Sequence, residues 1–273
     1  MSSNLLYANE EDEIINLEDV YNREKDSLPQ LINNDPVEFV HRYDNDRDRE
    51  IAGFLASQFA YGRIDIFKKF LEDMFSRMDE GPYHFTINGD FTLLRGLYYR
   101  FQKEEDIVLL FTVLRKALND FGSIGGMVKH FYRNDVREAL WRVRTHLLGD
   151  SDALTFFFPK PLLSNPMKRW NLYLRWMVRK DRVDAGLWDF IDRKNLIIPL
   201  DTHIFKIGRC LGWTACNTPS YRAAQEITEA LKKYSPEDPL KYDLFLCHVV
   251  GIGAGCMGKK SPVCASECLI YSV

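Results

Sequence analysis

The sequence predicts an all-α protein, and three observations lead to this fold class. Apolar residues recur at helical spacing through most of the chain, and no convincing run of alternating β-branched residues is present. No internal repeat or low-complexity tract interrupts this pattern. With 273 residues, of which 46 % are hydrophobic and 13 % aromatic, the chain can bury a large core in one domain or in two lobes.

About ten helices are expected along the chain. Residues 48–63 are apolar on nearly all sides, which predicts a buried helix, whereas residues 64–78 are amphipathic. Further helices are expected at 12–32, at 35–43 after an Asp-Pro start, and at 91–101, 104–120, 134–148, 221–233 and 239–251. Residues 81–90 are expected to form a turn-rich link, and residues 121–132 a glycine-punctuated loop that enters a helix. An aromatic and basic helix is expected in LSNPMKRWNLYLRWMVRK.

The segment PLDTHIFKIGRCLGW predicts a well-defined helix over residues 202–211. Asp201 is a good N-cap, because its carboxylate can accept the unpaired N–H groups of the first turn. Gly212 followed by Trp213 is typical of a glycine C-cap with its hydrophobic contact. Two interpretations of Asp201 therefore stand side by side: a helix cap, or a carboxylate that also does chemistry.

The charge pattern limits the classes of partner. The net charge is −3, which argues weakly against a nucleic-acid ligand, but basic clusters at 136–146 and 168–180 are compatible with a local basic face. No window of 18 uncharged apolar residues is present, so no membrane span is expected. The acidic start lacks the order of a signal peptide, and the expected location is cytoplasmic.

All six cysteines lie beyond residue 209, and four of them crowd the last 27 residues. Disulfides are not expected in a reducing cytosol, so this crowding raises the question of a metal or iron–sulfur site. The four candidate ligands are Cys247, Cys256, Cys264 and Cys268.

The order of segments resembles the helix-hairpin-helix DNA glycosylases. The matching features are a buried helix ending in LASQ, the later PLDTHIFKIGRCLG and a cysteine-rich tail, together covering roughly residues 48–268. DTHIF is similar to the V-D-T-H-I-x-R motif of the endonuclease III-like branch, and the YNR/DPVEFVHRY and KRxNLxLRWMVR segments are similar to a bacterial family in that superfamily. The resemblance implies an N-terminal extension at 1–47 and a two-lobed helical region at 48–273, with a cleft between the lobes.

Carried over by this resemblance, Asp201 is the active-site aspartate that stabilises the cationic sugar or deprotonates the nucleophile. An oxocarbenium-like transition state is stabilised by a nearby carboxylate. The G-x-G-R-K-T-A hairpin of the family is missing here, which puts the lysine nucleophile in doubt. Lys168, which lies 33 residues before Asp201, is the candidate, and this longer separation resembles the archaeal 8-oxoguanine glycosylase branch. A phosphate-contacting or helix-starting role is the alternative for Lys168.

Three further residues are expected at the DNA interface. The resemblance makes Gln58 the side chain that fills the gap left by an extruded base, with a polar residue ending an apolar helix as the alternative. Arg63 and Arg169 are expected to contact phosphates. The aromatic stripe that includes Trp170 and Trp176 is interpreted mainly as core packing.

The cysteine tail departs from the family pattern. The family loop has the spacing C-x6-C-x2-C-x5-C. Here the spacing is C-x7-C-x3-C, so each of the two intervals is one residue longer, and Pro262 stands two residues before the second cysteine, as in the family. A [4Fe–4S] cluster normally needs four thiolates, so Cys247 or an external ligand would complete the set. A zinc site with His248 and free thiols are the alternatives.

The sequence therefore predicts a monomeric base-excision repair glycosylase, with or without lyase activity, that acts on damaged double-stranded DNA. The alternatives are a non-catalytic helical nucleic-acid-binding protein that kept the fold and a helical protein-interaction module.

Overall fold

The protein is all-helical in the part of the chain that the structure describes. The structure is a computed structural model, and it describes residues 17–262, 264 and 268–270. Within these residues there is no strand, and extended pairing is limited to isolated bridges at Tyr99–Gln102 and Lys180–Ala185. The α-helices are α1 (Leu17–Glu24), α2 (Asp46–Phe59), α3 (Ile64–Phe75), α4 (Pro82–Asn88), α5 (Glu104–Phe121), α6 (Ile124–Phe131), α7 (Val136–Leu148), α8 (Lys168–Val178), α9 (Thr202–Cys210) and α10 (Tyr221–Lys232).

Shorter helical elements connect these helices. They are the 3₁₀ turns η1 (Leu28–Asn34), η2 (Pro36–Arg42), η3 (Phe91–Leu94), η4 (Arg193–Asn195) and η5 (Pro239–Tyr242), and the π-helix η6 (Phe245–Gly253). Side-chain caps start many of the elements, since a short polar side chain can accept from the unpaired N–H groups of a first turn. The capping residues are Asp35, Asn45, Asp90, Ser123, Asp135, Asp192, Asp201 and Ser220.

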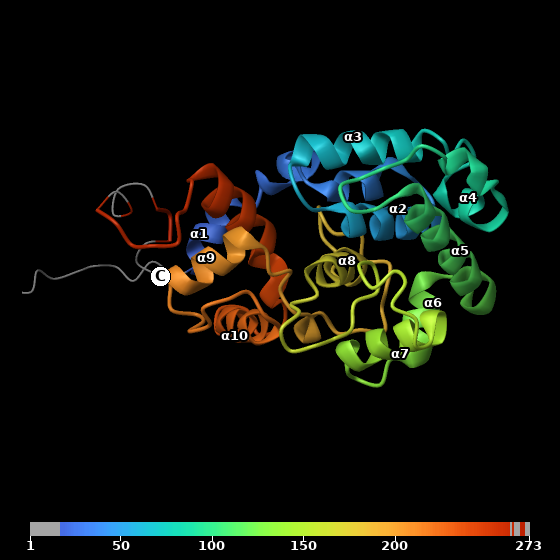
Figure 1. Cartoon of the computed structure of the whole chain (residues 1–273). Helices are drawn as coiled ribbons and strands as arrows, with labels where there is room; N and C mark the ends of the chain where they lie inside the picture. The colour runs from blue at the N-terminus through green and yellow to red at the C-terminus, as the bar shows by residue number, and fades with distance from the viewer. Residues whose placement is uncertain (1–16, 263, 265–267, 271–273) are drawn as a thin grey trace, which may run out of the picture.

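The helices form two groups (Figure 1). On one side α9 and α10 pack together with η5 and η6, and α1 lies beside them. On the other side α2 packs on η2, α4 and α8, and α4, α5, α6 and α7 follow one another in contact. None of the described helices has both the length and the apolar character that crossing a bilayer requires.

The helix α8 holds the aromatic core of the second group. Trp170 and Trp176 are almost fully buried, which confirms their interpretation as core residues. The ring of Phe54 on α2 meets the ring of Trp170 edge-to-face, with 5.4 Å between centroids. Gly53 lets the two helices approach closely, since a Cβ there would lie 3.0 Å from the Cε atom of Met177.

Several local predictions differ from the structure. The helix expected at 12–32 is divided into α1 and the 3₁₀ turn η1, with residues 12–16 outside the described part of the chain, and the helix expected at 35–43 is the 3₁₀ turn η2. Residues 81–90 hold the helix α4 rather than only a link, because Pro82 is suited to a first helical turn. The helix expected at 91–101 stops at Leu94, since Gly96 adopts a φ of 81°. The segment 239–251 is not a regular α-helix but η5 followed by the wider π-helix η6.

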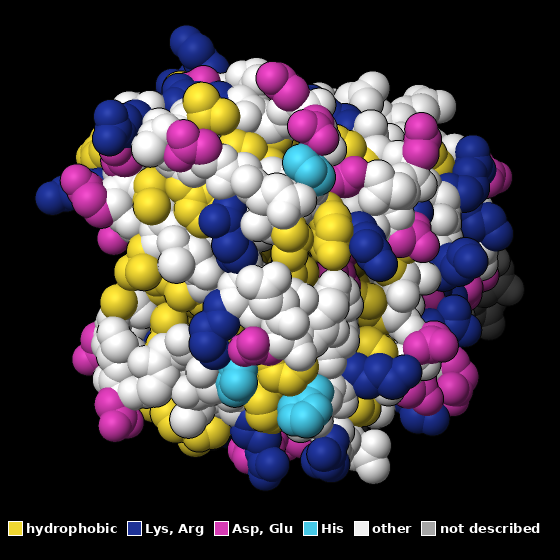
Figure 2. Space-filling model, turned by 90° about the vertical axis from the view of Figure 1, so that its right-hand side faces the viewer, with side chains coloured by type: hydrophobic (Ala, Val, Ile, Leu, Met, Phe, Trp, Pro, Cys, Tyr) yellow, Lys and Arg dark blue, Asp and Glu magenta, His cyan; other side chains and the backbone are white. Residues whose placement is uncertain are grey.

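The end of the molecule formed by α4, α5 and α6 has a mixed surface (Figure 2). Lys and Arg side chains are interspersed with Asp and Glu side chains over this face. This face therefore gives no support for docking of a polyanion.

Candidate functional site

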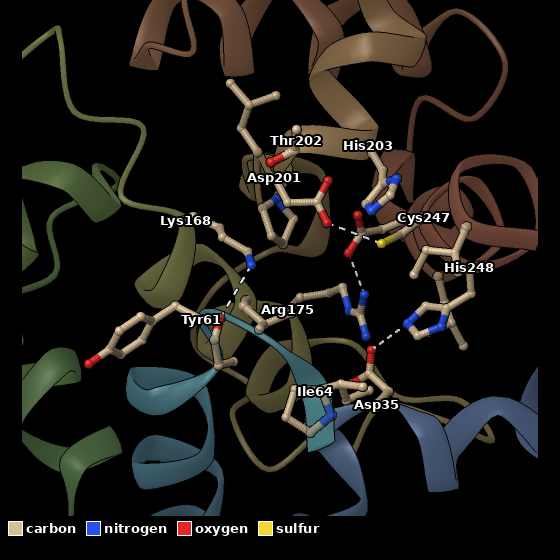
Figure 3. Close-up of a pocket in the computed structure, with 18 of the residues that line it drawn as sticks. Asp35, Tyr61, Ile64, Lys168, Arg175, Asp201, Thr202, His203, Cys247 and His248 are labelled. Atoms are coloured by element: carbon tan, nitrogen blue, oxygen red, sulfur yellow. Dashed lines mark hydrogen bonds and ion pairs between the residues drawn. The ribbon is translucent and has the colours of Figure 1, made fainter. Parts of the chain in front are cut away.

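A cavity of about 470 Å³ lies between the two groups of helices. Its walls come from η1 and η2, the end of α2, the starts of α3, α8 and α9, and the η5–η6 region. The charged and polar residues that line it are Asn34, Asp35, Tyr61, Lys168, Arg175, Asp201, Thr202, His203, Asp243, Cys247 and His248, most of which Figure 3 labels.

Asp201 both caps α9 and faces this cavity. Its Oδ1 atom accepts a hydrogen bond of 2.8 Å from the backbone N–H of Ile204. Its Oδ2 atom accepts a hydrogen bond of 3.1 Å from the thiol of Cys247. The predicted C-cap is also present, since Gly212 has a φ of 70° and the N–H of Trp213 donates to the carbonyl of Gly208. The capping role therefore does not remove the carboxylate from the cavity.

Lys168 is the first residue of α8, and its side chain lies in the same cavity. The preceding residue, Met167, has a left-handed φ of 51°, which turns the chain sharply into α8. The Nζ atom donates to the carbonyl of Ala60 over 3.4 Å. Among residues 17–262, no carboxylate lies within ion-pair distance of this amine. Lys168 and Asp201 thus line one cavity from two separate elements (Figure 3).

Asp35 and His248 form a hydrogen-bonded pair on the opposite wall. The Nε2 atom of His248 lies 3.0 Å from Oδ2 of Asp35, and Oδ1 caps η2 by accepting from the N–H of Val37. Burial alone would raise the pKa of Asp35, but the hydrogen bond from His248 and the charge of Arg175 hold this pKa below its ordinary value. His248 is therefore largely buried, and its ring is hydrogen-bonded to a carboxylate.

Arg175 is a buried cation two helical turns after Lys168. Its Nε atom donates to Asp184 over 3.2 Å, and its Nη1 atom donates to Oδ2 of Asp243. Burial raises the pKa of Asp243 to about 6, against the opposing charge of Arg175. The sequence reasoning missed Arg175, although Lys168, Leu172 and Arg175 lie at helical spacing on one face of α8.

Two buried polar atoms of the lining residues have no hydrogen-bond partner in the described part of the chain. They are Nη2 of Arg175 and Nδ1 of His203. Unpaired buried polar atoms are uncommon in folded proteins and call for an explanation such as an unseen water or ligand. Both residues belong to the cavity wall, but neither of these two atoms is itself exposed.

Cys247 belongs to the cavity and not to the cysteine tail. Burial raises the pKa of this thiol well above its ordinary value, and the charge of Asp201 raises it further. A protonated thiol is a hydrogen-bond donor, which agrees with its contact to Asp201. Sequence spacing alone gave no indication of this contact.

The three residues predicted to contact DNA differ in how far they are exposed. Gln58 is completely buried, so its side chain does not reach a surface where it could fill a gap in DNA. Arg169 donates to the carbonyls of Gln58 and Phe156, and its guanidinium lies 3.6 Å from the ring centroid of Phe156. Burial lowers the pKa of Arg169 to about 10. Only Arg63 is exposed, where it pairs with Asp65 over 2.7 Å.

The predicted ligand set Cys247, Cys256, Cys264 and Cys268 is not brought together. Among the described residues, no three His, Cys, Asp or Glu side chains converge on one metal position. Instead Cys210, at the end of α9, is the neighbour of the tail: burial raises its pKa, and the thiols of Cys256, Cys264 and Cys268 raise it further. Gly258 also packs on Lys206, one turn before Cys210.

Comparison with known families gives one match. A family model described as a protein of unknown function, DUF2400, matches residues 35–252. No curated protein and no solved structure gives a significant match. The matched region contains every lining residue of the cavity except Asn34.

Proposed function

We propose that this protein is a DNA base-excision glycosylase. The chain belongs to the DUF2400 family, whose description assigns no activity. One observation carries this proposal: Asp201, at the N-terminus of α9, and Lys168, at the N-terminus of α8, line the same cavity. A carboxylate and an amine without a counter-charge are the two groups that a glycosylase with lyase activity needs.

The glycosylase-like fold is part of the same proposal. Two helical groups flank the cavity, and the PLDTHIF segment supplies the aspartate at the start of a helix. The hairpin of that superfamily would be divergent in this chain. The N-terminal segment 1–47 would then contribute to the cavity through Asn34 and Asp35.

The chemistry assigns a separate task to each group. The carboxylate of Asp201 stabilises positive charge on the deoxyribose as the glycosidic bond breaks. In the lyase version, the amine nitrogen of Lys168 attacks the sugar carbon C1′ and forms a new C–N bond. The bond from C1′ to the base nitrogen breaks, its electron pair leaves with the base, and a proton released by the attacking amine goes to the base. The C1′–O4′ bond then breaks, the ring oxygen takes up a proton, and the Schiff base is formed.

A [4Fe–4S] cluster in the C-terminal segment is also proposed. Cys247 does not fit as a ligand, because its thiol donates to Asp201. The surroundings of Cys210 support this residue as the fourth thiol beside Cys256, Cys264 and Cys268. A bound cluster would serve to join α9 to the C-terminal segment.

Borohydride trapping tests the proposed amine directly. The protein is mixed with duplexes that contain an abasic site or 8-oxoguanine, and sodium borohydride reduces any Schiff base to a stable crosslink. We expect the wild type to be trapped, Lys168→Gln not to be trapped, and the exposed control Lys160→Gln to behave like the wild type. DNA binding without trapping or base release would favour the non-catalytic alternative.

A further inference from the structure

An exposed tight turn stands beside the cavity. In the turn Tyr99–Gln102, the N–H of Tyr99 donates to the carbonyl of Gln102 over 3.0 Å, and the N–H of Gln102 donates back over 2.9 Å. Phe101, at the tip, is 69 % exposed. Such an exposed aromatic ring on a closed turn contributes little to the core of the protein.

The turn is firmly joined to the cavity wall. The hydroxyl of Tyr61 donates to the Oε1 atom of Gln102, and the hydroxyl of Tyr99 donates to the carbonyl of Tyr61. The rings of Tyr61 and Tyr99 also meet edge-to-face, with 4.9 Å between centroids. Tyr61 is a lining residue, and its ring points away from the other labelled lining residues (Figure 3), so these contacts hold the turn on the outer side of that wall.

Arg100 connects the tip of the turn to the same wall. Its guanidinium carbon lies 5.5 Å from the ring centroid of Phe101 and 5.6 Å from that of Tyr61. Its Nη1 atom lies so close to Gly62, a lining residue, that a Cβ there would collide with it. Arg100 itself has a φ of 55°, and non-glycine residues with such backbone strain cluster at functional sites.

Cations accompany the exposed aromatic rings of the turn. The segment RGLYYRFQK (95–103) contains Arg95, Arg100 and Lys103. The nearest following carboxylates, Glu104 and Asp106, accept hydrogen bonds from the backbone N–H groups of Gly96 and Lys103. Tyr98 is 64 % exposed, so a second aromatic ring accompanies the cations. Apolar side chains flanked by Arg and Lys are the means by which proteins enter and unstack base steps in duplex DNA.

We propose that Phe101 is a wedge that enters the base stack of duplex DNA at the place from which a nucleotide has been extruded into the cavity. Arg100 then contacts a flanking phosphate. This assignment gives to Phe101 the gap-filling role that the buried Gln58 cannot take. It rests on the proposed function in one respect, namely that the cavity receives the extruded nucleotide.

The test uses a duplex that cannot react. It carries a tetrahydrofuran abasic analogue, which has no base to release, and a 2-aminopurine next to it, whose fluorescence rises when it is unstacked. We expect the wild-type protein to bind this duplex and to raise the fluorescence. Phe101→Ala should lose the fluorescence change and bind about tenfold more weakly, which is the order of one stacking contact.

Two variants serve as controls. Phe101→Leu keeps an apolar side chain and should retain most of the signal. Trp141→Ala removes an aromatic side chain on α7 that is 39 % exposed and outside the cavity, and it should behave like the wild type. Thermal unfolding of all variants checks that each remains folded.

Each outcome decides the inference. A Phe101→Ala variant with unchanged affinity and fluorescence overturns the wedge, and so does a wild type that does not bind the duplex. If the signal depends on Phe101 but no modified base is ever released from damaged DNA, the wedge is supported and the glycosylase proposal fails. If bases are released and Phe101→Ala has no effect on the signal, only the wedge fails.

Discussion

The thiol of Cys247 donates a hydrogen bond of 3.1 Å to the Oδ2 atom of Asp201. The other carboxylate oxygen accepts from the N–H of Ile204, so both oxygens have fixed partners. The carboxylate is therefore held in one orientation at the start of α9, in the cavity that also contains Lys168. Preorganised groups of this kind stabilise developing charge without reorganisation during a reaction.

The reactivity of Cys247 should report on this contact. Because burial and the charge of Asp201 raise the pKa of the thiol, Cys247 should react slowly with iodoacetamide at pH 8. Asp201→Asn removes one negative charge, lowers the pKa of the thiol and should increase its alkylation rate about tenfold, the effect of a pKa change of about one unit. Mass spectrometry of the Cys247 peptide measures the rate.

Asp135→Asn is the matched control for that experiment. Asp135 caps α7 as Asp201 caps α9, by accepting from the N–H three residues ahead, but it lies outside the cavity. The control should alkylate Cys247 at the wild-type rate. Equal rates in Asp201→Asn and Asp135→Asn would show that the thiol does not sense the Asp201 charge.

The lowered pKa of Asp35, which is hydrogen-bonded to His248, predicts how the stability of the fold changes in acid. Since the folded-state pKa of Asp35 is lowered, its ionised form stabilises the fold above the ordinary value of 3.8, and this contribution is lost as pH falls below that value. Asp35→Asn should lower the free energy of unfolding at pH 7 by roughly 3 kcal/mol, as expected for a broken buried pair.

The difference between wild type and Asp35→Asn should shrink as the pH falls below about 4, because the wild type then loses the same charge. Chemical denaturation at several pH values measures it. Asp150→Asn, an exposed carboxylate change after α7, should show almost no difference at any pH. A difference between wild type and Asp35→Asn that stays constant with pH would contradict the role given to this ionisation.

Serine variants of Cys210 and Cys247 test which of these two thiols binds the proposed cluster. Anaerobically purified protein should be brown and contain iron, and Cys210→Ser should abolish both, because Cys210 is the neighbour of Cys256, Cys264 and Cys268. Cys247→Ser should keep the cluster, since that thiol faces Asp201. Iron analysis and visible absorption measure the result. Loss of the cluster in Cys247→Ser with retention in Cys210→Ser would reverse this assignment.

Local sequence patterns predicted the elements that carry the central residues. The cap at Asp201 and the helix after it follow from adjacent residues, and the observed α9 ends one residue before the expected boundary. Lys168 and Arg175 are seven residues apart, a spacing that places both on one side of α8, so the sequence also indicates that Arg175 faces the cavity. The all-helical class follows from the same periodicity.

The rest of the site depends on packing between distant segments. Cys247 and Asp201 are 46 residues apart, and Asp35 and His248 are 213 residues apart, so no local pattern could pair them. The resemblance placed Gln58 at the DNA interface, but Gln58 is fully buried. A polar residue at the end of an apolar helix does not reveal in the sequence whether other segments will cover it. The turn with Phe101 was predicted as part of a helix, since the effect of Gly96 on the backbone was missed.

The most direct test of the central claim measures base release by the cavity carboxylate. Oxidised, alkylated and deaminated duplex DNA is incubated with an excess of protein, and the free bases are identified by mass spectrometry. We predict that the wild type and Asp135→Asn release at least one modified base, and that Asp201→Asn does so about a hundredfold more slowly or worse, the order for losing one stabilising group. Asparagine still caps a helix well, so folding should be preserved. Release of the same bases at the same rate by Asp201→Asn, or no release by the wild type, would contradict the account.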